Sequence, residues 1–209
     1  MTKVKVCGIM NKEELDYAIL GGADAVGFIV EVERSRHRIS AEDARNLICR
    51  VPVFTKSVAV IAPDSIEGAV VLAQETGADI LQVHGTLGAD EIKALKKRVP
   101  QKVIAAVPPG MGAHSMDGVA DAVLLDTFKD GKLGGSGIIH DWKVSAILAK
   151  QLGAPVILAG GLNPLNVGEA IRTVRPYAVD VSSGVETNGR KDREKVESFI
   201  KEVRSCQQL

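Results

Sequence analysis

Short apolar runs recur along the chain, and segments with helical periodicity separate most of them. Each run has the length of a β-strand, and several consist almost wholly of Val, Ile, Leu and Ala, as in strands buried on both faces of a parallel sheet. Eight such runs lie at residues 4–6, 25–30, 57–61, 79–83, 103–107, 122–125, 156–159 and 178–181. The pattern therefore predicts eight parallel strands.

The intervening segments predict helical crossovers. Four apolar residues between 196 and 203 have the i, i+3, i+4, i+7 spacing of one helical face, and the segment 167–174 repeats it. Two helix starts are marked by a cap residue three positions before an acid, at Asn11 with Glu14 and at Ser40 with Asp43. Alternating strands and helices predict an α/β fold, and eight repeats predict a (β/α)8 TIM barrel. Residues 108–121 carry little helical signal, so the fifth helix is expected to be short or missing.

Composition and length further restrict the number of domains and the size of the loops. The chain has 209 residues and is 45% hydrophobic, which is enough to bury the core of one domain spanning residues 1–209. A (β/α)8 barrel typically has about 250 residues, so a barrel of this length must have short loops. No linker or low-complexity tract divides the chain.

Charge and cysteine content exclude several partners and compartments. Lys plus Arg and Asp plus Glu each number 26, and aromatic residues are only 3%, so neither nucleic acid nor an anionic membrane is expected as a partner. No apolar run approaches the roughly 18 residues that span a bilayer. The three cysteines form no close-spaced ligand motif, and their odd number predicts reduced thiols in the cytoplasm.

Two loops near the end of the chain have the composition of a phosphate site. Gly160 and Gly161 follow one apolar run, and Asn163 and Pro164 then resemble the N-cap and first residue of a helix. Ser183 and Gly184 follow the last run. Small residues and helix N-termini present backbone N–H groups, and the last two loops of such barrels commonly bind phosphate. We expect no obligatory cation there, and expect a side chain at Gly161 or Gly184 to block the anion by its bulk.

The catalytic candidates come from the ends of two other strands. Cys7 follows the first run, and Asp126 follows the sixth. In a (β/α)8 barrel the active site lies at the carboxyl ends of the strands, so both side chains should face one cavity. A cysteine at such a position is often inert, and an aspartate often caps a loop. As a pair, however, they offer the base and the acid that a proton-shuttling isomerase requires.

Seven ordered segments give the chain an end-to-end resemblance to the phosphoribosylanthranilate isomerases of tryptophan biosynthesis. The resemblance implies an Amadori rearrangement of N-(5-phosphoribosyl)anthranilate to 1-(2-carboxyphenylamino)-1-deoxyribulose 5-phosphate, without a metal or organic cofactor. It also implies that Cys7 is the general base and Asp126 the general acid. The segments are KVCGI (5–9), GADAVGF (22–28), LQVHG (81–85), LLDT (124–127), GGSG (134–137), AGGLNPxNV (159–167) and VDVSSGVE (179–186).

The sequence departs from the family at the arginine that holds the anthranilate carboxylate. It has SRHRIS at residues 35–40, with His37 where simple alignment places that arginine. A one-residue insertion would restore Arg36 or Arg38, and we favour Arg36, whose planar fork matches a carboxylate. A solvated charge is the alternative for either arginine.

Four weaker candidates complete the predicted site. The resemblance implies that Gln82 and His84 line the pocket. Asp180 either binds a substrate hydroxyl or forms a structural ion pair. The glycine-rich segment 134–137 either closes over the ligand or simply connects two elements.

Two other functions remain open at this stage. One is another phosphate-binding barrel, above all the histidine-pathway isomerase. The pattern of that family has two aspartates as its acid–base pair, so the thiol at position 7 disfavours it. The other is a non-catalytic barrel that binds a sugar phosphate, for which an acid–base pair would be unnecessary. The small-molecule partner is a phosphorylated substrate, and the sequence leaves monomer and homodimer open.

Overall fold

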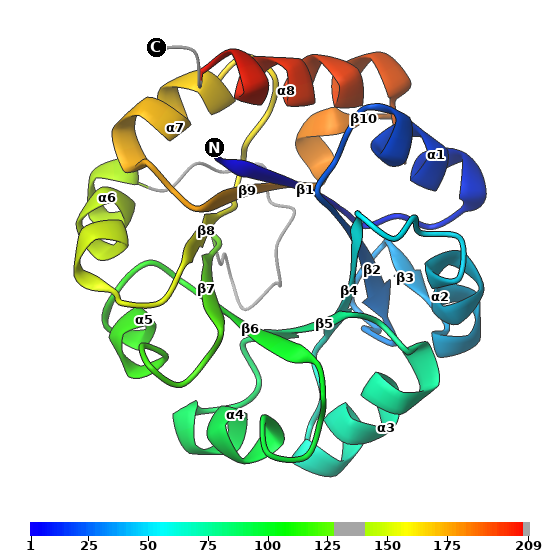
Figure 1. The fold of residues 1–209 in the computed structure, drawn as a ribbon, viewed down its shortest axis with the longest axis vertical. Helices are drawn as coiled ribbons and strands as arrows, with labels where there is room; N and C mark the ends of the chain where they lie inside the picture. The colour runs from blue at the N-terminus through cyan, green and yellow to red at the C-terminus, as the bar shows by residue number, and fades with distance from the viewer. Residues whose placement is uncertain (128–140, 207–209) are drawn as a thin grey trace.

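Eight parallel strands close into a barrel in the computed structural model of this chain, which describes residues 1–127 and 141–206. Each strand pairs with the next, and β1 pairs with both β2 and β9, which closes the ring. Figure 1 looks down this ring. The strands are β1 (Lys3–Cys7), β2 (Ala25–Val30), β4 (Lys56–Ile61), β5 (Ile80–His84), β6 (Lys102–Val107), β7 (Ala122–Leu125), β8 (Val156–Leu158) and β9 (Ala178–Val181).

Helices surround the strands on all sides (Figure 1). They are α1 (Lys12–Leu20), α2 (Ala41–Ile48), α3 (Ile66–Thr76), α4 (Ala89–Leu95), α5 (Met111–Ser115), α6 (Trp142–Gln151), α7 (Val167–Val174) and α8 (Arg193–Ser205). The predicted TIM barrel is therefore confirmed, including the short fifth helix. The sequence pattern missed four short elements: β3 (Arg38–Ile39), the 3₁₀ turn η1 (Ser183–Val185), and the paired β10 (Glu186–Thr187) and β11 (Arg190–Lys191).

The predicted helix starts agree with the structure at two helices and differ at a third. The side chains of Asn11 and Ser40 accept hydrogen bonds from the backbone N–H groups three residues later, as predicted. Helix α7 begins at Val167 rather than at Pro164. Asn163 instead caps a preceding turn, where its side chain accepts a bond from the N–H of Leu165.

Strand alternation separates two cores. On β1, Val4 and Val6 pack outward in the large core between strands and helices. Cys7 points the other way, into a smaller cluster inside the barrel with Val58 and Val60. The barrel interior is therefore a packed space, and the polar side chains at its carboxyl end are buried within it.

Candidate active site

Cys7 occupies the last position of β1, and its side chain is buried. The chain turns away immediately afterwards, because Gly8 adopts a positive φ of 78°. The N–H groups of Gly8 and Ile9 both donate to the carbonyl of Gly27 on β2, at 2.9 and 3.0 Å, which fixes this turn. Burial raises the pKa of the Cys7 thiol, and the neighbouring ammonium of Lys5 opposes that rise.

Asp126 follows the last residue of β7, and β8 and β9 lie between that strand and β1. Its carboxyl group is buried, and its Oδ1 accepts a 2.7 Å hydrogen bond from the N–H of Thr127. Burial raises the pKa of Asp126 to about 6, and the negative charge of Asp180 adds to this effect. At pH 7 a minor fraction of the molecules therefore carries the protonated acid. An aspartate in this state can donate a proton near neutrality.

His84 and Gln82 both lie on β5 and are buried. The Nε2 atom of His84 lies 3.9 Å from Oδ2 of Asp126. Burial lowers the pKa of His84 to about 4, so the ring is neutral at physiological pH and supplies no counter-charge to Asp126. The side-chain oxygen of Gln82 finds no hydrogen-bond partner among the described residues. These positions are consistent with the pocket-lining role expected for both residues.

Asp180 forms a buried ion pair. Its Oδ1 lies 2.9 Å from Nζ of Lys5, and both side chains are less than a tenth exposed. Of the two alternatives for Asp180, the ion pair is the one that the structure contains. Sequence reasoning missed Lys5, although the signal was present: it lies two residues before Cys7 in a strand, and therefore on the same face.

The three basic residues 36–38 separate into distinct environments. Arg36 is more than half exposed, and its Nη2 lies 2.6 Å from Oε2 of Glu186. Arg38 instead donates from Nε to Glu31, at 3.1 Å. His37 is buried, and its Nε2 lies 2.9 Å from the other carboxylate oxygen of Glu186. Arg36 therefore contacts Glu186, which is also the partner of His37, the residue at the family's arginine position. Arg38 does not share this partner.

Glu186 is the centre of this charged cluster. Its Oε1 also lies 2.5 Å from Nζ of Lys191, which is almost fully buried. Burial by itself would raise the pKa of Glu186, but His37 and Lys191 outweigh it and hold that pKa at about 2. A permanently ionised Glu186 thus fixes Arg36 from one side, while much of the guanidinium faces solvent.

The two predicted phosphate loops pack against each other and against Asp126. Gly160 and Gly161 both have positive φ, 83° and 67°. A Cβ on Gly160 would lie 2.5 Å from the Thr127 hydroxyl and 3.1 Å from Oδ1 of Asp126. A Cβ on Gly184 would lie only 1.8 Å from the carbonyl oxygen of Leu162. A side chain at Gly184 would therefore strike the protein itself first, which differs from the expected direct block of an anion.

Other features of the chain add no further group to this site. No set of three His, Cys, Asp or Glu residues that could hold a metal occurs in the two described segments. No helix within residues 1–127 or 141–206 is long and apolar enough to cross a membrane. The predicted closing segment 134–137 lies outside the described residues.

Comparison with known proteins gives one consistent result. Residues 4–202 match the family model of N-(5′-phosphoribosyl)anthranilate isomerase. The enzyme of that name from Methanothrix thermoacetophila is 58% identical, and the alignment covers 99% of this chain and all of the relative.

Two solved structures are similar over the same length. Phosphoribosylanthranilate isomerase in complex with reduced 1-(o-carboxyphenylamino)-1-deoxyribulose 5-phosphate is 34% identical, with a TM-score of 0.81 over 98% of this chain and all of that one. Monomers generated from the dimeric enzyme of Thermotoga maritima are 32% identical, with a TM-score of 0.82 and the same coverage.

Proposed function

The chain belongs to the N-(5′-phosphoribosyl)anthranilate isomerase family, and we propose that Cys7 and Asp126 carry out the family's reaction. It is an isomerase of tryptophan biosynthesis, which converts an aminoaldose phosphate to the corresponding aminoketose. The observation that carries the assignment of roles is geometric: Cys7 ends β1 and Asp126 directly follows β7, so both lie buried at the carboxyl ends of the barrel strands, where burial raises the pKa of Asp126 to about 6. Perturbed acids in such a position are typical of catalytic sites.

Asp126 acts first in this mechanism. Its carboxylic acid protonates the furanose ring oxygen, and the C1′–O bond breaks as the anthranilate nitrogen donates its lone pair. The product of this step is an open-chain iminium ion with a free hydroxyl, while Asp126 is left ionised. Because the substrate's own amine stabilises the cation, the step requires no other electron sink.

Cys7 acts second. The iminium group acidifies the proton on C2′, and the thiolate of Cys7 removes it, which leaves an enolamine that tautomerises to the ketone. At neutral pH a buried thiol with a raised pKa is mostly protonated, whereas Asp126 is mostly ionised. The reactive form, thiolate with carboxylic acid, differs from that major form only in the location of one proton. Its population therefore depends on how well the site stabilises the thiolate.

Three further groups position the substrate. We assign the anthranilate carboxylate to Arg36, whose guanidinium is held by Glu186 yet more than half exposed. The phosphate is assigned to the backbone N–H groups of the Gly160–Gly161 and Ser183–Gly184 loops. Among the described residues, the N–H groups of Gly160 and Gly161 have no hydrogen-bond acceptor, and η1 begins at Ser183, where the first N–H groups of a helix lack internal partners. Gln82 and His84 complete the wall beside Asp126.

A turnover assay with two substrates tests this proposal. Phosphoribosylanthranilate should lose its anthranilate fluorescence in the presence of the purified chain, and the aminoribosyl substrate of the histidine pathway should remain unchanged. Cys7→Ala and Asp126→Asn serve as inactive controls. Faster turnover of the histidine-pathway substrate than of phosphoribosylanthranilate would assign the site to the alternative isomerase. Binding of phosphoribosylanthranilate without turnover would indicate a barrel that only binds a sugar phosphate.

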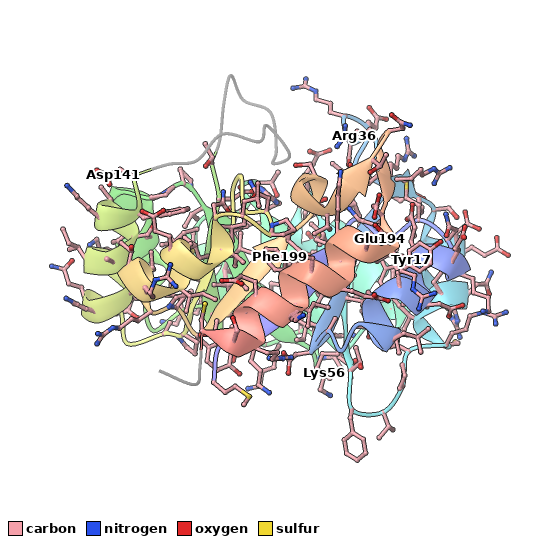
Figure 2. The ribbon with its side chains drawn as sticks, turned by 90° about the horizontal axis from the view of Figure 1, so that it is seen from above. Tyr17, Arg36, Lys56, Asp141, Glu194 and Phe199 are labelled. Atoms are coloured by element: carbon pink, nitrogen blue, oxygen red, sulfur yellow. The ribbon has the colours of Figure 1, made fainter. Side chains whose placement is uncertain are left out.

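The face opposite the active site supports a homodimer. Residues 51–55 form a loop before β4, and Val53 and Phe54 are 84% and 96% exposed. Figure 2 shows this loop extending from the face where Lys56 lies. The same face carries a cavity of about 470 Å³ whose apolar lining includes Val58, Ile80 and Ile104.

A protruding apolar loop and an apolar cavity on one face are self-complementary, as a two-fold interface requires. Lysines at the rim are paired with aspartates, so two such faces do not repel each other. The T. maritima relative is a dimeric enzyme.

Sedimentation measurements test the dimer. The wild-type chain should sediment as a dimer, and Phe54→Glu as a monomer with its kcat retained, because the loop lies on the far face of the barrel from the site. Ile147→Glu on the outside of α6 replaces another exposed apolar residue and should leave the dimer intact. A monomeric wild-type chain at micromolar concentration would contradict the assignment.

We also assign the enzyme to the cytoplasm. Cys7, Cys49 and Cys206 are all free thiols, as expected for a protein of a reducing compartment.

A further inference from the structure

Lys5 is a buried charge inside the barrel that the reaction as described above does not use. Its side chain is only 3% exposed, and it lies on the same face of β1 as Cys7. Isolated lysines are rarely buried, because their transfer out of water is unfavourable without a partner. Asp180 supplies one partner at 2.9 Å, and the same ammonium is close enough to Cys7 to interact with it electrostatically.

A glycine on the neighbouring strand makes room for this contact. Gly27 of β2 is the register partner of Cys7. A Cβ at Gly27 would lie 2.8 Å from Sγ of Cys7 and 3.0 Å from Nζ of Lys5, so both atoms approach the space that a side chain would fill. The φ of Gly27 is ordinary, so conformational freedom does not require a glycine here. The missing side chain instead allows the ammonium to fold towards the sulfur.

We propose that Lys5 is a positioning residue whose ammonium, seated in the space left by Gly27 and anchored by Asp180, stabilises the thiolate of Cys7. The inference rests on the proposed role of Cys7 as the base. An opposite charge within about 4–6 Å typically lowers a pKa by 1–3 units, and the effect is large where water is excluded. Lys5 thereby increases the fraction of molecules that carry a reactive thiolate.

Asp180 sets the limit of this effect. With Asp180 ionised and Lys5 protonated, formation of the thiolate leaves the buried group of three with a net negative charge, which is unfavourable. Burial is the largest influence that raises the pKa of Cys7, and Asp180 also raises it, whereas Lys5 and, more weakly, Lys191 lower it. Lys191 is itself bound to Glu186, which leaves Lys5 as the principal cation near the sulfur among the described residues. The Lys5–Asp180 ion pair therefore allows a fraction of the Cys7 thiol to ionise, but it does not keep the thiol ionised in every molecule.

Thiolate absorbance in the ultraviolet, followed against pH, tests the proposal without requiring turnover. The background is Cys49→Ser with Cys206→Ser, so that Cys7 is the remaining thiol, and Cys7→Ser in the same background is the blank. Lys5→Met should raise the titration midpoint of Cys7 by about one pH unit or more. Asp180→Asn should lower it, because the thiolate then becomes the counter-ion of Lys5. If Lys5 and Asp180 only stabilised the fold, their separate losses should not shift the Cys7 titration midpoint in opposite directions.

Three further variants keep the test decisive if an orphaned charge impairs folding. Lys5→Met with Asp180→Asn removes both charges, and its midpoint should lie above that of Asp180→Asn alone. Gly27→Ala fills the space without changing charge and should raise the midpoint as the ammonium moves away. Lys5→Arg should restore part of the wild-type midpoint and of kcat.

Kinetics provide a second readout. Lys5→Met should lower kcat about tenfold or more with a smaller change in KM, because the ammonium acts on the base rather than on the substrate. A folded Lys5→Met chain with an unchanged Cys7 midpoint would overturn the proposal, as would shifts of the same sign from Lys5→Met and Asp180→Asn. Either result would leave the isomerase function intact, because the titration and the turnover assay are separate measurements.

Discussion

Aspartates lie at both ends of the barrel strands, and the two groups have opposite properties. At the amino ends, each of three aspartates precedes a strand, accepts a hydrogen bond from the backbone of the neighbouring strand, and pairs with the lysine that begins that neighbour. The pairs are Asp24 with Lys3, Asp79 with Lys56, and Asp121 with Lys102. Their pKa values are lowered, because these bonds outweigh the partial burial that would raise them.

At the carboxyl ends, Asp126 and Asp180 are buried and their pKa values are raised. Asp126 has one backbone N–H as a hydrogen-bond donor, from its own neighbour Thr127, and a second carboxylate nearby. The same residue type therefore stabilises the fold at one end of the barrel and carries a mobile proton at the other. The environment makes this difference: partly exposed carboxylates with cationic partners stay ionised to low pH, whereas a buried carboxylate with little support, such as Asp126, keeps its proton to a higher pH.

The largest expected effect comes from the base. Cys7→Ala should reduce kcat by roughly 10²- to 10⁴-fold or more, because it removes the general base to which we assign removal of the C2′ proton. Cys7→Ser should be nearly as impaired, since a hydroxyl is a far weaker base near neutrality. Binding of a reduced product analogue, measured by calorimetry, should change little in both. Near-normal turnover by purified Cys7→Ala would refute the assignment.

Asp126→Asn should separate activity from stability. Turnover should fall by roughly 10²- to 10⁴-fold, chiefly in kcat, because an amide cannot deliver the proton that opens the ring. At the same time, the variant should be more stable than the wild type at pH 7 by roughly 2–3 kcal/mol in the free energy of unfolding.

The sign of this stability change follows from the pKa of Asp126. Its folded value of about 6 lies above the ordinary 3.8, so ionisation disfavours the folded state, and the penalty grows as pH rises from about 4 to 6. The advantage of Asp126→Asn in urea denaturation should accordingly vanish near pH 4. An inactive variant that is also destabilised at pH 7 would indicate that Asp126 is a structural ion-pair residue.

The phosphate loops should give the next largest effect. Gly161→Ala places a Cβ at a position with a φ of 67°, which disfavours the observed backbone and moves the N–H groups assigned to the anion. We expect the affinity for phosphorylated ligands to fall about tenfold or more, and that for anthranilate alone to change much less. Gly112→Ala, where a Cβ meets open space, is the matched control. Equal losses for both ligands would argue against a phosphate site at this loop.

The sequence predicted the fold better than it predicted the site's electrostatics. The segments 25–30, 122–125 and 178–181 match β2, β7 and β9 to the residue, because strands buried on both faces leave an unbroken apolar signal. Lys5 escaped notice because its partner Asp180 is 175 residues away in sequence and meets it only through the β1–β9 pairing that closes the barrel.

His37 illustrates the same limit. It lies between two arginines for which a solvated charge was the alternative, and nothing in the sequence indicated that it is buried against Glu186, a contact that depends on the position of the β10–β11 hairpin. Local pattern determines which residues form strands and helices. The pairing of buried charges depends on contacts between distant segments, which one sequence does not reveal.

The smallest effect should come from the opposite end of the barrel. Asp121→Ala removes an acceptor for the N–H of Val103 and a partner of Lys96 and Lys102. Because these groups are partly exposed, we expect a loss of only about 1–2 kcal/mol in the free energy of unfolding, with kcat and KM unchanged. Asp121→Asn keeps an acceptor oxygen and should lose less.

The pKa of Asp121 is lowered, so its stabilisation is present above the ordinary carboxyl pKa near 4 and disappears as pH falls through the folded value. The difference between wild type and Asp121→Ala in urea denaturation should therefore shrink on acidification through and below pH 4, whereas that for Asp126→Asn should grow between pH 4 and 6. If both variants showed the same pH trend, the contrast between the two ends of the barrel would fail.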